Sequence, residues 1–407
     1  SIGTTGERMI RAISKNQSSD GASPRRVLHV VNGQHYAGAA RVQDLLAESL
    51  PGFGYDVAFA CLLPGRFEAE RQSQRAELFN VPMKHRMDFG PVREIARIIR
   101  EGGFDILHSH TTRSAMIAAA AAKLTDVPYV HHVHCQMNTE VDRRMKSFVN
   151  TSIERFACRN ADHVIAVSNS IRRFLLNNGF THTPIKVVAN GVPTTARRPL
   201  RTEFDPWTIG MVALLRERKG LETLLRAFAE LRQTSNNIRL RIVGPFETDE
   251  YERSVRSLAE SQGVADHIDW VGFTRDVNVE LRRMDLLVLP SVLPEGMPMV
   301  LLEAMAAGVS IVGSRVEGIG DVIRHEQNGL LADPANVHSL AKQIRRFISG
   351  DVCLNSLRDE GLRDFRYRFS TTAMASNVAA IYDSLIETNV EATDSKSARR
   401  LQPEYVR

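Results

Sequence analysis

The chain has 407 residues, 43% hydrophobic and 24% charged, a composition typical of a globular protein long enough for two domains. Its net charge of +5 arises from basic residues interleaved with acidic ones, which argues against nucleic-acid binding because that needs a denser basic patch. Four cysteines without CxxC spacing predict neither a zinc site nor disulfides, and without a recognisable signal peptide or a roughly 20-residue apolar run we expect a reduced, cytoplasmic protein.

Short apolar runs alternate with longer amphipathic stretches along the chain. This pattern is typical of parallel sheets covered by helices on both faces, so we predict an α/β protein with doubly wound sheets. Strands are expected in the first half at 26–31, 56–60, 106–109, 129–133, 164–167 and 185–188, and in the second half at 208–212, 238–243, 268–271, 286–289 and 310–312.

The domain boundary is expected where Gly and Pro punctuate a turn at 190–193, followed by a loop rich in arginine and proline. The two ends of the chain are polar and lack a sustained hydrophobic period, so we predict that they form flexible tails. The predicted organisation is a tail at 1–24, a first domain at 25–193, a hinge at 194–206, a second domain at 207–369, a C-terminal helix at 370–388 and a tail at 389–407.

The first strand is followed by a glycine-containing turn that leads into a helix. The turn lacks the G-x-G-x-x-G of dinucleotide-binding proteins and the Gly-Lys-Ser/Thr of P-loops, which argues against nicotinamide and ATP chemistry. Two interpretations of Gly38 stay open: it forms a tight turn, or it lets the backbone approach a ligand closely.

Histidines are concentrated at two strand ends, at 108–110 and 131–134. No H-E-x-x-H motif or spaced cysteine pair accompanies them, so we predict no metal site. Strand alternation places His132 and His134 on one face and His131 on the other.

Two segments of the second half have the chemistry of a phosphate site. Arg216, Arg218 and Lys219 lie between a strand and a helix, where cations suit a diphosphate, although an exposed basic turn would also explain Arg218. After the buried strand at 286–289, Gly296 and Pro298 open a helix whose N-terminus favours an anion at the carboxyl edge of the sheet.

Two glutamates flank the start of this helix. Glu303 has apolar neighbours, so its charge requires a partner. Eight helical residues span roughly 12 Å, more than the roughly 5–9.5 Å between the carboxyl groups of glycosidases. Glu295 and Glu303 are therefore predicted to bind a phosphorylated, hydroxyl-rich ligand and not to act as an acid–base pair.

The segment PEGMPMVLLEAMAAG at 294–308, with its Glu-x7-Glu spacing, resembles the signature of retaining glycosyltransferases of family 4, which have the GT-B fold. The resemblance covers roughly residues 26–388. Further segments match in family order: YAGAARV at 36–42, VHHVHC at 130–135, ADHVIAVS at 161–168, ANGVP at 189–193 and RERKGLETLL at 216–225. The resemblance implies two Rossmann-like domains facing a central cleft, with the C-terminal helix crossing back to the first domain.

Residue roles follow from the same resemblance. Gly38 matches the loop near the donor diphosphate, with Ala37 in place of the usual second glycine. Leu214 stands where the family commonly has arginine, which leaves Arg216 or Arg218 as the second cation. The implied catalytic residues are His134 beside the transferred sugar, Lys219 and Glu295. The implied donor-binding residues are Gly38, Arg216, Lys219, Glu295, Gly296, Met297, Pro298, Met299 and, at the ribose hydroxyls, Glu303.

The implied reaction is retaining transfer of a sugar from a UDP-sugar or GDP-sugar to an acceptor hydroxyl by same-face displacement. We expect no cofactor and no divalent metal, since no Asp-x-Asp motif accompanies the donor segment. The expected acceptor is a saccharide or lipid-linked saccharide, as in bacterial surface polysaccharide or glycolipid synthesis. A helix around 141–158 with apolar and basic residues is explained either by ordinary packing or by peripheral contact with the inner face of the plasma membrane. A nucleotide-sugar 2-epimerase and a catalytically silent nucleotide-sugar-binding protein stay open as alternatives.

Overall fold

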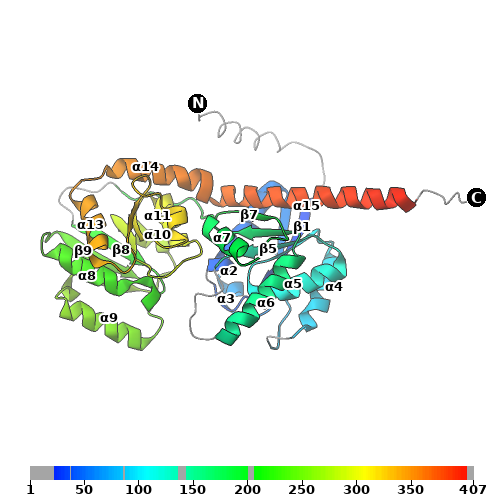
Figure 1. Cartoon of the computed structure of the whole chain (residues 1–407), viewed down its shortest axis with the longest axis horizontal. Helices are drawn as coiled ribbons and strands as arrows, with labels where there is room; N and C mark the ends of the chain where they lie inside the picture. Colours follow the sequence, from blue (N-terminus) through cyan, green and yellow to red (C-terminus); the bar gives the residue numbers. More distant parts are fainter. Residues whose placement is uncertain (1–22, 37, 86–87, 136–143, 200–205, 401–407) are drawn as a thin grey trace, which may run out of the picture.

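Two parallel sheets form the framework of the computed structural model, which describes residues 23–36, 38–85, 88–135, 144–199 and 206–400 (Figure 1). The first sheet has the order β3-β2-β1-β4-β5-β6-β7 and the second the order β10-β9-β8-β11-β12-β13. Each order reverses direction beside its central strand, between β1 and β4 and between β8 and β11. Open α/β sheets bind ligands at such switch points, outside the carboxyl ends of the strands.

All eleven strands expected from the sequence are present, within a residue or two at each end. Two further strands, β3 and β13, were not predicted; each has three residues and lies at a sheet edge. The strands are β1 Arg25–Val31, β2 Tyr55–Cys61, β3 Leu78–Asn80, β4 Ile106–Ser109, β5 Tyr129–Val133, β6 His163–Ala166, β7 Ile185–Val187, β8 Trp207–Val212, β9 Ile238–Val243, β10 Ile268–Gly272, β11 Leu286–Leu289, β12 Ser310–Ser314 and β13 Leu330–Ala332.

Helices cover the faces of both sheets (Figure 1). In the first domain they are α2 Gly38–Ser49, α3 Arg66–Glu70, α4 Gly90–Gly102, α5 Thr112–Thr125, α6 Arg144–Asn160 and α7 Asn169–Asn177. In the second they are α8 Leu221–Arg232, α9 Asp249–Ser261, α10 Val277–Leu281, α11 Met299–Ala307, α12 Ile319–Val322, α13 Val337–Ile348 and α14 Leu354–Asp364. Most have one apolar face, but α11 is apolar nearly all round and buried, as expected for a helix enclosed by protein.

The C-terminal helix, α15 Thr371–Arg400, returns from the second domain and runs along the first (Figure 1). Its Tyr382 is fully buried, and the hydroxyl of Tyr55 donates to Asp383 at 2.5 Å. The helix extends beyond the predicted end at residue 388. Residues 389–400 contain no Gly or Pro, so the sequence gives the helix no stop signal there. The flexibility expected of residues 389–407 stays a prediction.

The predicted hinge is partly described. Residues 194–199 have no regular structure, and the N–H of Arg198 donates to the Ala307 carbonyl at 2.8 Å, which ties this segment to α11. Residues 200–205 of the hinge, 1–22 of the N-terminal tail and 401–407 of the C-terminal tail lie outside the described residues.

Candidate functional site at the junction of the two domains

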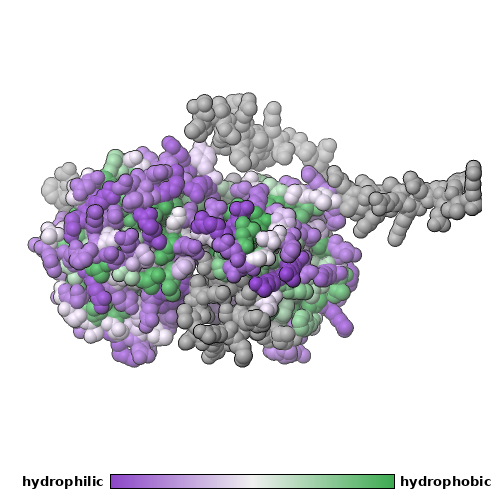
Figure 2. Space-filling view, viewed as in Figure 1, coloured by the Kyte–Doolittle hydropathy of each residue, from purple (hydrophilic) through white to green (hydrophobic). Residues whose placement is uncertain are grey.

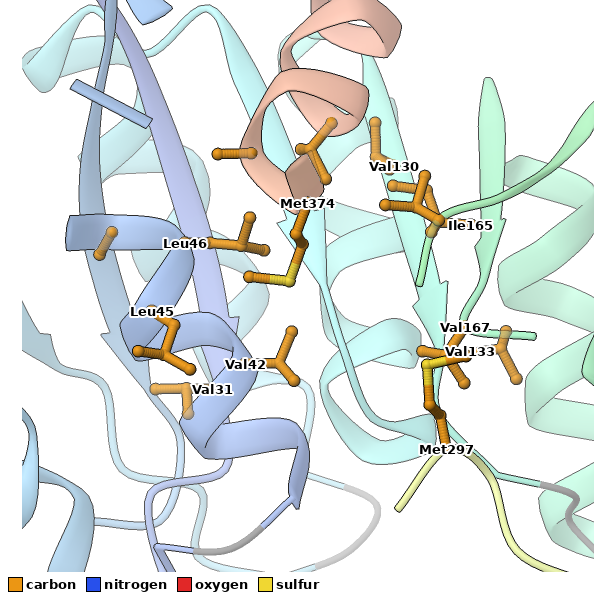
Figure 3. Close-up of a cluster of buried hydrophobic side chains, with 14 of the residues drawn as sticks. Val31, Val42, Leu45, Leu46, Val130, Val133, Ile165, Val167, Met297 and Met374 are labelled. Carbon is orange, nitrogen blue, oxygen red and sulfur yellow. The ribbon is translucent and has the colours of Figure 1, made fainter. Parts of the chain in front are cut away.

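The loops after β5 and β11 touch across the domain junction. Gly296 packs so closely against the His134 carbonyl oxygen that any side chain at this position would overlap it. The amide of Asn190 donates to the Met297 carbonyl at 3.3 Å. Figure 3 shows the Met297 side chain beside Val133 and Val167 of the first domain, where it is 8% exposed. The segment that opens α11 is thus held between the two sheets.

Lys219 and Glu295, two of the predicted catalytic residues, form an ion pair. Lys219 Nζ lies 2.7 Å from Glu295 Oε1, and the Ser291 hydroxyl donates to the same oxygen at 2.8 Å. Their loops are locked together, because Gly220, at φ 72°, packs against the Pro290 carbonyl where a side chain would not fit. The structure therefore brings an ammonium group and a carboxylate to the switch point of the second sheet.

The start of α11 adds hydrogen-bond donors to this pair. In the described part of the chain, the backbone N–H groups of Gly296, Met297, Met299 and Val300 have no acceptor. Pro298 precedes the helix and has no N–H to donate. Because Met297 and Met299 bury their side chains, a ligand here would meet backbone N–H groups and the positive end of the helix dipole.

The two arginines of the basic turn have different surroundings. Arg218 donates to the Pro294 carbonyl at 2.6 Å, which places it against the loop that carries Glu295. Arg216 pairs instead with Glu247 at 3.4 Å, and both of these side chains are partly exposed. Leu214 is 44% exposed. The geometry favours Arg218 over Arg216 as a cation near the ligand, while the donor-binding role predicted for Arg216 stays a prediction.

Glu303 is buried in α11 and paired with a residue that the sequence did not single out. Arg41 Nη2, from α2 of the first domain, lies 2.5 Å from Glu303 Oε1. Burial disfavours the charged guanidinium, but the Glu303 carboxylate outweighs this and raises the pKa of Arg41. The apolar neighbours of Glu303 signalled that a partner must exist. That Arg41 supplies it could not be seen, since the contact joins residues 262 positions apart.

Gly38 begins α2, one turn before Arg41. A side chain at Gly38 would meet no atom within 4 Å, so the space beside it is open to a ligand. The glycine that this loop needs for packing is Gly33, which has φ 77° and lies against Cys61 and the Leu63 carbonyl. Ala37 lies outside the described residues.

His134 is half-buried at the end of β5. Its Nε2 lies 3.0 Å from His110 Nδ1, and its ring stacks on His132 with centroids 4.3 Å apart. Burial lowers the pKa of His134 to about 3, so the ring is neutral at pH 7. His131 points to the opposite face, where it contacts Ser109 and Glu154 at 2.9 and 2.8 Å. The predicted alternation of these histidines is confirmed.

Helix α6 corresponds to the helix for which the sequence left ordinary packing and membrane contact open. Ala157 and Cys158 are buried, α6 packs against α5, and Lys123 lies over the ring of Phe156 at 5.4 Å. Ordinary packing accounts for Ala157 and Cys158, whereas Phe156 is 41% exposed. Residues 141–143 and the side chains of residues 144–151 lie outside the description. Among the described residues, no helix combines the length and the hydropathy that a membrane span needs. The face shown in Figure 2 is mainly hydrophilic, with apolar residues in small patches.

Two families match consecutive parts of the chain. Residues 36–196 match Glycosyltransferase Family 4, and residues 193–362 match Glycosyl transferases group 1. The glycosyltransferase MJ1607 of Methanocaldococcus jannaschii, itself uncharacterized, is 26% identical over 307 residues, covering 70% of this chain and 76% of the relative. The putative colanic acid biosynthesis glycosyltransferase WcaL of Escherichia coli is 28% identical over 237 residues, covering 55% and 58%.

Solved structures share the architecture. Anabaena HepE in complex with UDP aligns with a TM-score of 0.78 at 19% identity, covering 88% of this chain and 100% of that one. The same protein in complex with UDP-glucose aligns with a TM-score of 0.76 at 19% identity, covering 88% and 99%. Two Rossmann-like domains with a site at their junction define the GT-B class, as the sequence predicted. With both family matches, the chain is a glycosyltransferase of the GT-B type.

Proposed function

We propose that the protein is a retaining hexosyltransferase of family 4 that moves a sugar from a nucleoside-diphosphate sugar to an acceptor hydroxyl. The observation that carries this proposal is the Lys219–Glu295 pair beside the unpaired N–H groups at the start of α11. A cation and a helix N-terminus together suit a diphosphate. In this proposal Glu303, which is buried eight residues after Glu295, accepts hydrogen bonds from the ribose hydroxyls.

In this mechanism the protein stabilises the leaving group. Lys219 and the N–H groups of Gly296 and Met297 neutralise the charge that develops on the diphosphate as the bond to the sugar breaks. Glu295 and neutral His134 orient the sugar by hydrogen bonds. In a same-face displacement the leaving phosphate oxygen takes the proton of the acceptor hydroxyl, so the reaction needs no protein base.

The donor can be identified by a thermal-shift screen of UDP, GDP and their sugars, because a ligand that binds only the folded state raises its melting temperature. The complexes of HepE with UDP and UDP-glucose support a uridine donor. We expect one nucleoside diphosphate to raise Tm, and acceptor-dependent release of that nucleotide to distinguish transfer from epimerisation or silent binding. A crystal structure that places UDP or GDP away from Lys219 and Glu303 would overturn the proposal.

The acceptor is proposed to be a saccharide or lipid-linked saccharide of a surface polysaccharide. Support comes from WcaL, whose name assigns it to colanic acid biosynthesis. Peripheral contact with the cytoplasmic face of the membrane belongs to the same proposal. It predicts co-sedimentation with anionic liposomes at low salt, and failure to sediment there would dismiss the contact.

Turnover is expected to be the same with and without added Mg²⁺ or Mn²⁺. Lys219 and the helix N-terminus already supply positive charge to the diphosphate, and same-face displacement adds no step that calls for a divalent ion. Initial rates in metal-depleted buffer, before and after each ion is added, test this. Strict dependence on either ion would contradict it.

Replacing His134 with alanine is expected to lower kcat by about 100-fold, the effect of removing one hydrogen-bond partner of the transition state. Stability should fall by only about 1 kcal/mol because the ring is half-buried. Steady-state kinetics and urea unfolding of the same preparation separate the two effects. His338→Ala, on the surface of α13, is the matched control and should behave as wild type.

A further inference from the structure

Five histidines gather on one face of the first sheet. They are His29 on β1, His108 and His110 at the end of β4, and His132 and His134 at the end of β5; we call them the histidine cluster. The strand register explains the gathering, since His29 is opposite His108. Neighbouring ring centroids are 4.2 Å apart for His108 and His110, and 5.0 Å for His29 and His110.

The cluster leaves several ring nitrogens without partners. His29 Nδ1, His108 Nε2 and His110 Nε2 are buried and have no hydrogen-bond partner among the described residues. The same holds for both nitrogens of His132. Buried polar atoms in native proteins are nearly always satisfied, so unpaired ones indicate a water or an ion.

In His29, His108 and His110 the other ring nitrogen does have a partner. The Tyr382 hydroxyl lies 3.2 Å from His29 Nε2 and 2.6 Å from His108 Nδ1. His110 Nδ1 lies 3.0 Å from His134 Nε2. A histidine that binds a metal through one nitrogen usually hydrogen bonds through the other, which fixes its tautomer and orientation. His29, His108 and His110 all show this arrangement.

We propose that His29, His108 and His110 bind one divalent late transition-metal ion of the Zn²⁺ class. One ring nitrogen of each lies within 4.8 Å of one ring nitrogen of the other two. With Zn–N bonds of about 2.0–2.1 Å, tetrahedral ligand atoms are about 3.4 Å apart, so the rings rotate and approach by roughly 1 Å on binding. Imidazole selects Zn²⁺, Co²⁺, Ni²⁺ and Cu²⁺ over Mg²⁺ and Ca²⁺.

Two other groupings fit less well. His110, His132 and His134 also come together, but His134 lies at the transfer site, and neither nitrogen of His132 is oriented by a partner. His131, Glu154 and Cys158 lie on the opposite face, where Glu154 already satisfies His131 at 2.8 Å. Burial also lowers the pKa values of His29, His108 and His110, which keeps these rings in the neutral form that binds metals.

A metal at this place is structural. It would join β1 to β4 and, through Tyr382, fix the docking of α15 on the first domain. The site takes no ligand from the Lys219–Glu295 pair, although His110 contacts His134 of the transfer site at 3.0 Å. Metal binding is therefore measured directly and not through activity.

Metal content and Co²⁺ binding test the proposal on the full chain. After chelation and dialysis we expect the protein to bind about one Co²⁺ per chain, with the visible absorption of a low-symmetry nitrogen site and a raised Tm. His29→Ala and His110→Ala should each abolish binding, while His338→Ala should retain it. Far-UV circular dichroism shows whether each variant is folded, and using two ligand variants guards against one that is not.

The outcomes are distinct. Loss of binding in His134→Ala, with binding retained in His29→Ala, would move the ion to the other triplet and overturn the assignment. A folded wild-type protein that binds no Co²⁺ or Zn²⁺ would show that ordered water satisfies the rings. Retained binding in both ligand variants would show adventitious metal only.

Discussion

Lys219→Ala is expected to lower kcat/KM by about 10²–10³-fold, or about 3–4 kcal/mol of transition-state stabilisation. The Lys219 side chain is 15% exposed and its ammonium group lies 2.7 Å from Glu295, so little solvent screens it from a diphosphate bound at the start of α11. The effect should fall mainly on kcat, because the charge on the leaving group grows as the sugar departs. Initial-rate kinetics with the donor found in the thermal-shift screen measure it.

Lys342→Ala is the matched control, since Lys342 lies exposed on α13. Lys219→Arg keeps the charge but replaces a compact ammonium group by a planar fork, so it should recover part of the activity. Ser291 still donates to Glu295 when Lys219 is lost, so the fold should survive. If Lys219→Ala and Lys342→Ala turn over at the same rate, the diphosphate is neutralised by another group.

The positions of eleven strands along the chain and the loops of the site could be predicted because their signals are local. β11, with the sequence LLVL, is buried along its whole length, and such an apolar run predicts a central parallel strand. β3 and β13 have three residues each and form only by pairing with β2 and β12. Nothing within three residues marks an edge strand, so tertiary context decides it.

Site residues that lie in one segment of the chain could be predicted. Contacts between residues of different domains could not. Glu295, Gly296 and the start of α11 follow from one stretch of sequence, and alternation placed His132 and His134 together. Arg41 reaches Glu303 only because α2 and α11 meet across the junction. His29 joins the other histidines only through the β1–β4 register. Such contacts depend on how sheets align, which residue spacing does not encode.

Glu303→Ala is expected to weaken binding of the nucleoside diphosphate by about tenfold to 100-fold, since hydrogen bonds to charged groups contribute about 1.5–3 kcal/mol. In the structure the carboxylate is occupied by Arg41, so the ribose hydroxyls must share it or displace the guanidinium. Isothermal titration calorimetry measures the loss of affinity. Equal affinity in Glu303→Ala and wild type would remove the ribose assignment.

Because Arg41 competes with the ribose for Glu303, Arg41→Ala is expected to have the opposite effect on the nucleotide to Glu303→Ala. Without Arg41, a carboxylate with a 6% exposed side chain is left unpaired, which lowers stability by up to about 3 kcal/mol. Ribose hydroxyls would then satisfy Glu303, so the nucleotide should raise Tm more in Arg41→Ala than in wild type. Arg97→Ala, which removes exposed ion pairs on α4, is the control and should change neither quantity appreciably. An equal nucleotide-induced shift in Arg41→Ala and wild type would mean that Arg41 and the nucleotide do not compete for Glu303.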